Sequence, residues 1–103
     1  PSHKGFEAIF SNPDLRQNSG IFFLLGKANS SEGPRLGVSI KKKDYQLAVQ
    51  RNLLKRRVKN SFKENAHNLP SFDFVVLVKP GKEEKANKTY LENLWIKCIK
   101  EGV

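Results

Sequence analysis

Apolar residues cluster at two places in the first 40 residues, and both patterns predict β-strands. Residues 21–25 (IFFLL) form a short apolar run rich in β-formers between two glycines. Leu36, Val38 and Ile40 alternate with small residues and predict a second strand. Residues 27–34 between the two are rich in turn formers, so we expect the strands to form an antiparallel hairpin.

The strongest strand signal lies further along the chain, at residues 72–78 (FDFVVLV). Strands that are covered on both faces carry nearly continuous apolar sequence, so this segment is expected to be a central strand. A further short strand is expected near residues 17–20.

Two segments at the ends of the chain have the periodicity of amphipathic helices. Phe6, Ile9 and Phe10 predict a short helix over residues 3–11, which Pro13 ends. The last helix is expected from apolar residues at i, i+3, i+4, i+7 and i+8, which are Leu91, Leu94, Trp95, Cys98 and Ile99.

A long helix is expected over residues 45–66, with Asp44 as its N-terminal cap. Its apolar stripe comprises Leu47, Leu54, Val58, Phe62 and Ala66. The passage through this helix, from the strand before it to the strand after it, has the dozen or more residues that a parallel crossover needs.

These elements predict an α+β fold in a single domain over residues 1–103. A chain of 103 residues has the length of one domain. The order of the elements favours a small two-layer sandwich, in which helices pack on one central sheet.

Composition favours a soluble globular protein. Hydrophobic residues make up 38% of the chain and charged residues 28%, which argues against disorder. No apolar run approaches the roughly 20 residues that span a bilayer, and no signal peptide is evident, so we expect a cytoplasmic protein without a membrane partner. The single cysteine excludes an internal disulfide and a CxxC metal site. The absence of methionine predicts that the natural start lies upstream.

Positive charge is concentrated in one segment. The net charge is +9, and residues 41–63 contain nine basic residues and one acid, which gives +8 of that total. A surface charged only for solubility would spread its charge, whereas this one indicates a polyanionic partner such as nucleic acid.

Four bases of the long helix are spaced by four residues and stack along one face: Arg51, Lys55, Lys59 and Lys63. Like charges at i, i+4 destabilise an isolated helix by about 0.2–0.5 kcal/mol for each pair. Glu64 is the only acid between residues 45 and 66, so relief within the helix is scarce. A solvated charged face is the simpler interpretation, but phosphates that supply the missing anions explain the pattern better.

Recognisable catalytic chemistry is absent from the sequence. His3 and His67 have no nucleophile or carboxylate at a motif distance, and Cys98 lies on an apolar helix stripe. We therefore predict no catalytic residues and no metal ligands in the protein itself. Four phenylalanines are candidates for stacking on unpaired bases, although such residues are usually core: Phe6, Phe10, Phe22 and Phe23.

Residues 51–56 (RNLLKR) resemble the R-N-R-x-K-R motif of the bacterial ribonuclease P protein subunit. Four further segments resemble that family in the same order: FEAIF at 6–10, PRLGVSI followed by lysines at 34–43, LPSFDFVV at 69–76, and Leu94-Trp95. Leu53 departs from the motif, because it stands where the second arginine is expected. The family also has a basic extension before its first helix, and this chain begins inside that helix.

The resemblance implies an αβββαβα order, with a left-handed crossover through the basic helix. It implies a holoenzyme in which the RNA subunit cuts precursor tRNA to release the 5′ leader, with Mg²⁺ held mainly by RNA. The protein would be an accessory subunit, inactive alone. Its expected partners are the catalytic RNA and precursor tRNA, with no protein partner evident.

The resemblance also implies two binding surfaces. Residues expected to contact RNA are Lys42, Lys43, Arg51, Asn52, Lys55, Arg56, Arg57, Lys59 and Lys63. A cleft for the single-stranded leader would be lined by Phe6, Phe10, Phe22, Ser39, Lys55 and Lys59.

Two alternatives stay open from the residues alone. A small structural RNA-binding protein, such as a ribosomal component, would share the basic helix. An autonomous nuclease would need convergent carboxylates or histidines, which the sequence does not indicate.

Overall fold

The computed structural model describes residues 9–29, 33–81 and 88–101. The elements in chain order are β1 (Leu15–Ser19), β2 (Phe22–Ala28), β3 (Arg35–Ile40), α2 (Ala48–Asn65), the 3₁₀ turn η1 (Ala66–Asn68), β4 (Phe72–Val78) and α3 (Lys88–Glu101). Residues 9–11 are helical and belong to the first expected helix, most of which lies outside the described residues.

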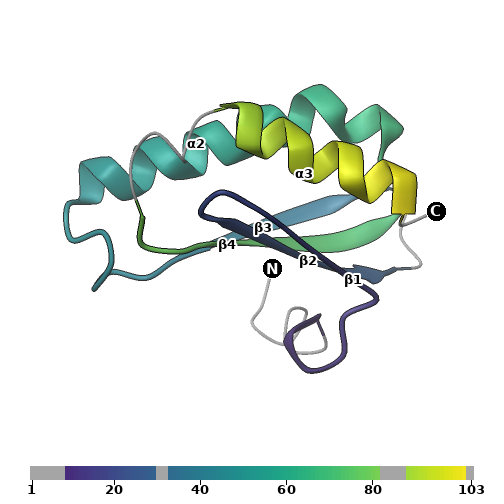
Figure 1. The fold of residues 1–103 in the computed structure, drawn as a ribbon, viewed down its shortest axis with the longest axis horizontal. Coiled ribbons are helices and arrows are strands. Elements are labelled where there is room, and N and C mark those ends of the chain that lie inside the picture. Colours follow the sequence, from purple (N-terminus) through teal and green to yellow (C-terminus); the bar gives the residue numbers. More distant parts are fainter. Residues whose placement is uncertain (1–8, 30–32, 82–87, 102–103) are drawn as a thin grey trace.

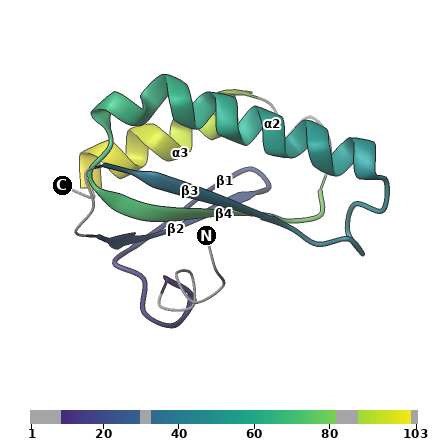
Figure 2. The ribbon, with the colours of Figure 1, turned by 180° about the vertical axis from the view of Figure 1, so that it is seen from behind.

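The fold has two layers. The four strands form one sheet in the order β1-β2-β4-β3, and α2 and α3 lie side by side on one of its faces (Figures 1 and 2). The segment that leads into β1 lies against the opposite face, which we call the open face (Figure 1). The expected α+β sandwich is therefore confirmed.

The expected hairpin between residues 21–25 and 36–40 is wrong. β2 pairs with β1 and β4, both antiparallel, whereas β3 pairs with β4 alone among the described strands, in parallel. β4 is the most apolar strand, and it takes the position between β2 and β3 where its edges and faces are covered. The true hairpin joins β1 to β2 through Gly20, whose φ of 60° suits the tight turn.

The parallel crossover is confirmed, because β3 and β4 are neighbours in register and α2 connects them. Its left hand remains an expectation from the family resemblance.

β4 is covered on both faces, as expected for a central strand. Phe74 and Val76 are fully buried under the helices, where Phe74 meets the Trp95 ring edge-on at 6.1 Å between centroids. Val75 points to the open face and packs with Ile9 and Leu25. The larger core thus lies between sheet and helices, and a small one lies under the N-terminal segment.

The basic helix begins later than expected. α2 starts at Ala48, and its N-cap residue is Leu47, which forms no side-chain capping bond. Asp44 instead lies in a turn after β3, where its N–H donates to the carbonyl of Lys41. Leu47 precedes the helix and is 63% exposed, so it does not belong to the core stripe.

Candidate nucleic-acid interface

Two flanks of α2 have different surroundings. The core side carries Leu54, Val58 and Ser61, which are buried. Glu64, on one flank, forms an ion pair of 3.2 Å with Lys88 of α3, so that flank faces α3. At about 100° per residue, Lys55, Lys59 and Lys63 project from the other flank.

The flank away from α3 carries cations without intramolecular anions. Lys55, Arg56, Lys59 and Lys63, here called the cationic flank, are exposed and form no ion pair with any residue that the structure describes. Nearby acids are engaged elsewhere: Glu64 with Lys88, and Glu92 with Ser61. The charge that the sequence concentrates on this helix is therefore available to an external polyanion.

Arg51 differs from Lys55, Lys59 and Lys63, the other bases spaced by four residues along this helix. Its Nη1 donates hydrogen bonds to the backbone carbonyls of Tyr45 at 2.7 Å and Gln46 at 3.0 Å. The side chain is half-buried and ties the segment before α2 to the first turns of the helix. Arg51 therefore has a structural role in addition to the RNA contact expected from the motif.

The other motif positions are divided between the flanks. Asn52 is exposed beside the cationic flank, while Arg57 lines a pocket on the side facing α3. Leu53 lines the same pocket and is 41% exposed. Lys42 and Lys43 are exposed in the turn after β3.

The open face of the sheet carries a row of side chains that crosses three strands. Phe23 of β2 pairs with Leu77 of β4, and Leu77 pairs with Ser39 of β3. Residues paired across strands point to the same face, so these three lie side by side. The Nζ of Lys79 lies 5.0 Å from the centroid of the Phe23 ring, a cation–π geometry.

A pocket of about 230 Å³ opens at the end of this row. Ser39 and Leu77 line it from the sheet, Lys41 and Lys79 bring positive charge, and Asp44 brings one carboxylate. An aromatic ring, two cations and a hydroxyl therefore lie together on the open face, a combination that suits a single strand of nucleic acid.

The leader cleft predicted from the family differs from this surface, most clearly at Phe22. Phe22 is fully buried on the helix side of the sheet, so the prediction that it lines the cleft is wrong. Phe23, the next residue, points to the open face instead because side chains alternate along a strand. The continuous apolar run gave no alternation from which the face could be inferred.

The remaining residues of the predicted cleft are divided between the open face and the helix layer. Phe10 is 51% exposed beside Ile9, which packs on the open face, and Ser39 is exposed on the same face. Lys55 and Lys59 belong to the helix layer. Because α2 lies over β3 while α3 lies over β1 and β2, their flank borders the β3 edge and not the open face itself. Phe6 lies outside the described residues.

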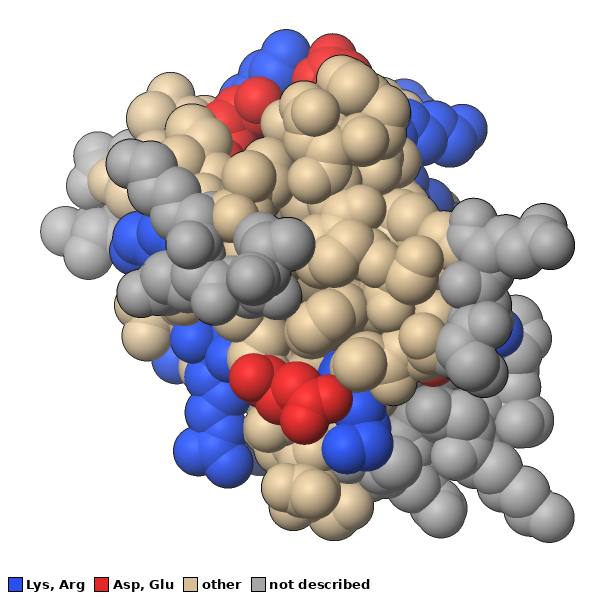
Figure 3. Space-filling model, turned by 90° about the vertical axis from the view of Figure 1, so that its right-hand side faces the viewer, with Lys and Arg blue, Asp and Glu red and all other residues tan. Residues whose placement is uncertain are grey.

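Figure 3 shows the face at the right-hand side of Figure 1. Uncharged side chains occupy most of its described surface, with Lys and Arg at the rim and Asp and Glu at the top and below the centre.

Asp73, Tyr45 and Cys98 have shifted pKa values and structural roles. Hydrogen bonds from Arg35 hold the pKa of Asp73 below its ordinary value, against a smaller opposing effect of burial. Burial raises the pKa of Tyr45, and its hydroxyl donates to the Lys79 carbonyl at 2.7 Å. Burial also raises the pKa of Cys98 to about 11, so this thiol is a poor nucleophile.

A family model described as Ribonuclease P matches residues 2–101. The chain belongs to the ribonuclease P protein family. It is 43% identical over 98 residues to the ribonuclease P protein component of Pectobacterium atrosepticum, covering 92% of this chain and 80% of that protein. It is 36% identical to the protein component of Idiomarina loihiensis, covering 97% and 81%.

Solved structures of the family share the fold. The ribonuclease P protein of Thermotoga maritima, solved with 1-(4-fluorophenyl)-2-thiourea, superposes with a TM-score of 0.74 at 25% identity, covering 95% of this chain and 94% of that one. The Staphylococcus aureus protein superposes with a TM-score of 0.76, covering 99% and 92%, and at 21% identity it supports the fold alone.

These matches confirm the resemblance found in the sequence. The chain is a protein subunit of ribonuclease P, the ribonucleoprotein endonuclease that removes the 5′ leader during tRNA processing and in which RNA is the catalyst. The ribosomal and autonomous-nuclease alternatives find no support among them. Among the described helices, none is long and apolar enough to cross a bilayer.

Proposed function

We propose that the protein binds the catalytic RNA through its cationic flank and holds the single-stranded 5′ leader of precursor tRNA on its open face. The observation that carries this proposal is the set of exposed cations on α2 that no described acid neutralises. Lysine and arginine on phosphates release counterions and supply affinity without regard to sequence.

The open face supports the leader part of the proposal. Phe23 is half-buried against the small core, and the rest of its ring could stack on a base, which is worth about 1–3 kcal/mol per base and tolerates any base. Lys41 and Lys79 lie within reach of a backbone that passes over this ring. Because leaders differ between tRNAs, tolerant stacking with phosphate contacts suits the task better than base-specific hydrogen bonds.

Magnesium belongs to this proposal as an ion held by RNA. Within the described ranges, no group of three or more His, Cys, Asp or Glu side chains gathers. The protein would act by offsetting phosphate repulsion between two RNAs. It should therefore lower the Mg²⁺ concentration at which the catalytic RNA cleaves precursor tRNA, and the protein alone should not cleave. We also propose that the protein performs this role in the cytoplasm.

The first test removes single cations from the flank. Lys55→Ala and Arg56→Ala should each weaken binding to the catalytic RNA and lower the slope of log K against log salt by roughly one unit, because one phosphate contact is lost. Fluorescence titration at several salt concentrations measures both quantities.

Lys88→Ala provides the matched control. Lys88 is an exposed helical lysine already paired with Glu64, so its removal should leave the salt slope unchanged. Unchanged slopes for Lys55→Ala and Arg56→Ala would remove the cationic flank from the RNA interface.

The second test separates leader binding from RNA-subunit binding. Phe23→Leu keeps an apolar side chain on the open face but removes the ring. It should weaken holoenzyme binding to precursor tRNA with a long leader by about fivefold or more, the equivalent of 1 kcal/mol of lost stacking. Binding to a precursor with a one-nucleotide leader should not change.

Ile96→Ala serves as the control, because this exposed apolar residue of α3 lies on the helix side of the molecule. If Phe23→Leu weakened both precursors equally, or neither, the ring would not contact the leader.

A further inference from the structure

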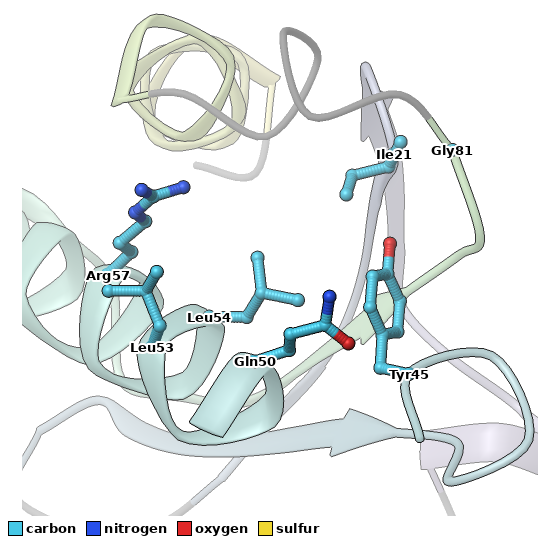
Figure 4. A pocket seen from close by; sticks show the side chains of 7 residues that line it. All are labelled: Ile21, Tyr45, Gln50, Leu53, Leu54, Arg57 and Gly81. Atoms are coloured by element: carbon cyan, nitrogen blue, oxygen red, sulfur yellow. The ribbon is translucent and has the colours of Figure 1, made fainter. Parts of the chain in front are cut away.

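A second pocket, distinct from the one on the open face, lies where α2 begins. Its volume is about 200 Å³, and the lining residues are Ile21, Tyr45, Gln50, Leu53, Leu54, Arg57 and Gly81. Figure 4 shows these side chains arranged around an open space, with Leu53, Leu54 and Gln50 rising from α2 and Ile21 facing them from the β1–β2 turn.

Buried residues and one fixed hydroxyl form the inner part of the pocket. Leu54 and Ile21 are buried and form apolar walls. The chain at Gly81 approaches so closely that a Cβ there would overlap Ile21 Cγ2, so a side chain at this position would force Ile21 to shift. The hydroxyl of Tyr45 is fixed by its hydrogen bond to the Lys79 carbonyl.

Polar groups at the pocket could form hydrogen bonds to the edge of a nucleobase. Gln50 carries an amide that can both donate and accept, and its side chain is exposed at the pocket. Arg57 adds a planar guanidinium on the same flank. Unpaired bases are recognised through stacking on aromatic rings or guanidinium planes and through hydrogen bonds to their edges, and Arg57 and Gln50 could supply one of each.

The size of the pocket and the charge of its lining limit which ligand it could bind. The volume exceeds the roughly 30 Å³ share of a water molecule several times, yet lies below the 300–1,000 Å³ of clefts for drug-sized ligands. It therefore suits one ring system. Of the seven lining residues Arg57 alone is charged, so the pocket suits a neutral ring whose attached group is anionic.

We propose that this pocket receives the base of one unpaired nucleotide of the catalytic RNA. The inference rests on the proposed binding of that RNA by α2 and extends it from phosphate contacts to a base contact. It also gives Leu53 a function: where the family motif has an arginine, this chain presents a partly exposed leucine at the mouth of an apolar pocket.

The test uses chemical footprinting of the catalytic RNA with the whole protein. Dimethyl sulfate reports on the Watson–Crick edges of adenine and cytosine, and a water-soluble carbodiimide reports on those of guanine and uracil. The unmodified protein should protect the edge of one unpaired nucleotide. The double variant Gln50→Ala/Leu53→Ala should lose this protection, with affinity reduced about fivefold or more and the salt slope unchanged.

Controls separate this proposal from the one before it. Val49→Ala alters a residue that is 76% exposed on the same helix and does not line the pocket, so it should keep the footprint. Gln50→Glu preserves the shape of the side chain but removes the amide donor, and it should also lose the protection, which covers the case in which the double variant folds poorly.

Each alternative outcome has a definite meaning. The proposal would be overturned if the protection persisted in both pocket variants or never occurred. If Lys55→Ala still lowered the salt slope in that case, the proposed RNA contact of the cationic flank would stand. A protein dimer in sedimentation that Leu53→Ala dissociates would assign the pocket to self-association and overturn it as well.

Discussion

Ser61 provides the buried polar contact between α2 and α3. Its Oγ accepts a hydrogen bond from Trp95 Nε1 at 2.8 Å and donates one to Glu92 Oε2 at 2.7 Å. Ser61 is 2% exposed and Trp95 is fully buried, so water cannot replace these bonds. One hydroxyl therefore satisfies an indole in the core and orients a carboxylate at its border.

Ser61→Ala should destabilise the protein by about 1–3 kcal/mol, because the Trp95 N–H would stay buried without an acceptor. Urea unfolding followed by tryptophan fluorescence measures the change. Asn60→Ala, at the exposed neighbouring position, should change the free energy of unfolding by no more than about 0.5 kcal/mol. A Ser61→Ala protein as stable as the parent would mean that the indole finds another acceptor.

At the scale of elements, α2 starts without a side-chain cap, and Arg51 provides the local stabilisation. Arg51→Ala should lower the free energy of unfolding by about 1–3 kcal/mol, since two charge-assisted hydrogen bonds to backbone carbonyls are lost. Amide exchange should accelerate at Gln50, whose N–H group bonds to the Leu47 carbonyl in the first turn. Asn52→Ala is the control. If the amides of the first turn exchanged at the same rate in both variants, Arg51 would not stabilise the start of α2.

Most elements could be predicted from the sequence because their apolar periodicity is local. β4 and α3 were found in this way, and the parallel crossover followed from the length of the connection. Strand pairing could not be predicted, because it depends on competition among strands for the central position. β1 (LRQNS) has little apolar sequence, so its role as the hairpin partner of β2 left only a weak signal.

The site was predictable to a similar extent. Charge on the helix is a property of composition and spacing, so the exposed Lys55, Arg56, Lys59 and Lys63 were anticipated. The face of the sheet to which a side chain points could not be predicted. Phe22 and Phe23 are chemically identical neighbours, and only the sheet decides which of them lies in the core. Neither pocket could be foreseen, because each joins residues from separate segments of the chain.

At the scale of the whole molecule, the two candidate RNA surfaces meet at one edge of the sheet. The cationic flank lies beyond β3 in the helix layer, and the row of Phe23, Leu77 and Ser39 crosses to the same strand on the open face. β3 therefore lies between the surface proposed for the catalytic RNA and the surface proposed for the leader. Such proximity lets a small protein contact a catalytic RNA and its substrate together.

The burial of Cys98 has a practical consequence for studying the complex. It is the sole thiol of the chain, it is fully covered, and its pKa of about 11 leaves it almost entirely protonated at neutral pH. A cysteine introduced on the surface would thus be the one group to react with a maleimide dye or photo-crosslinker. Attachment points around the β3 edge can be scanned one at a time while the native core stays intact.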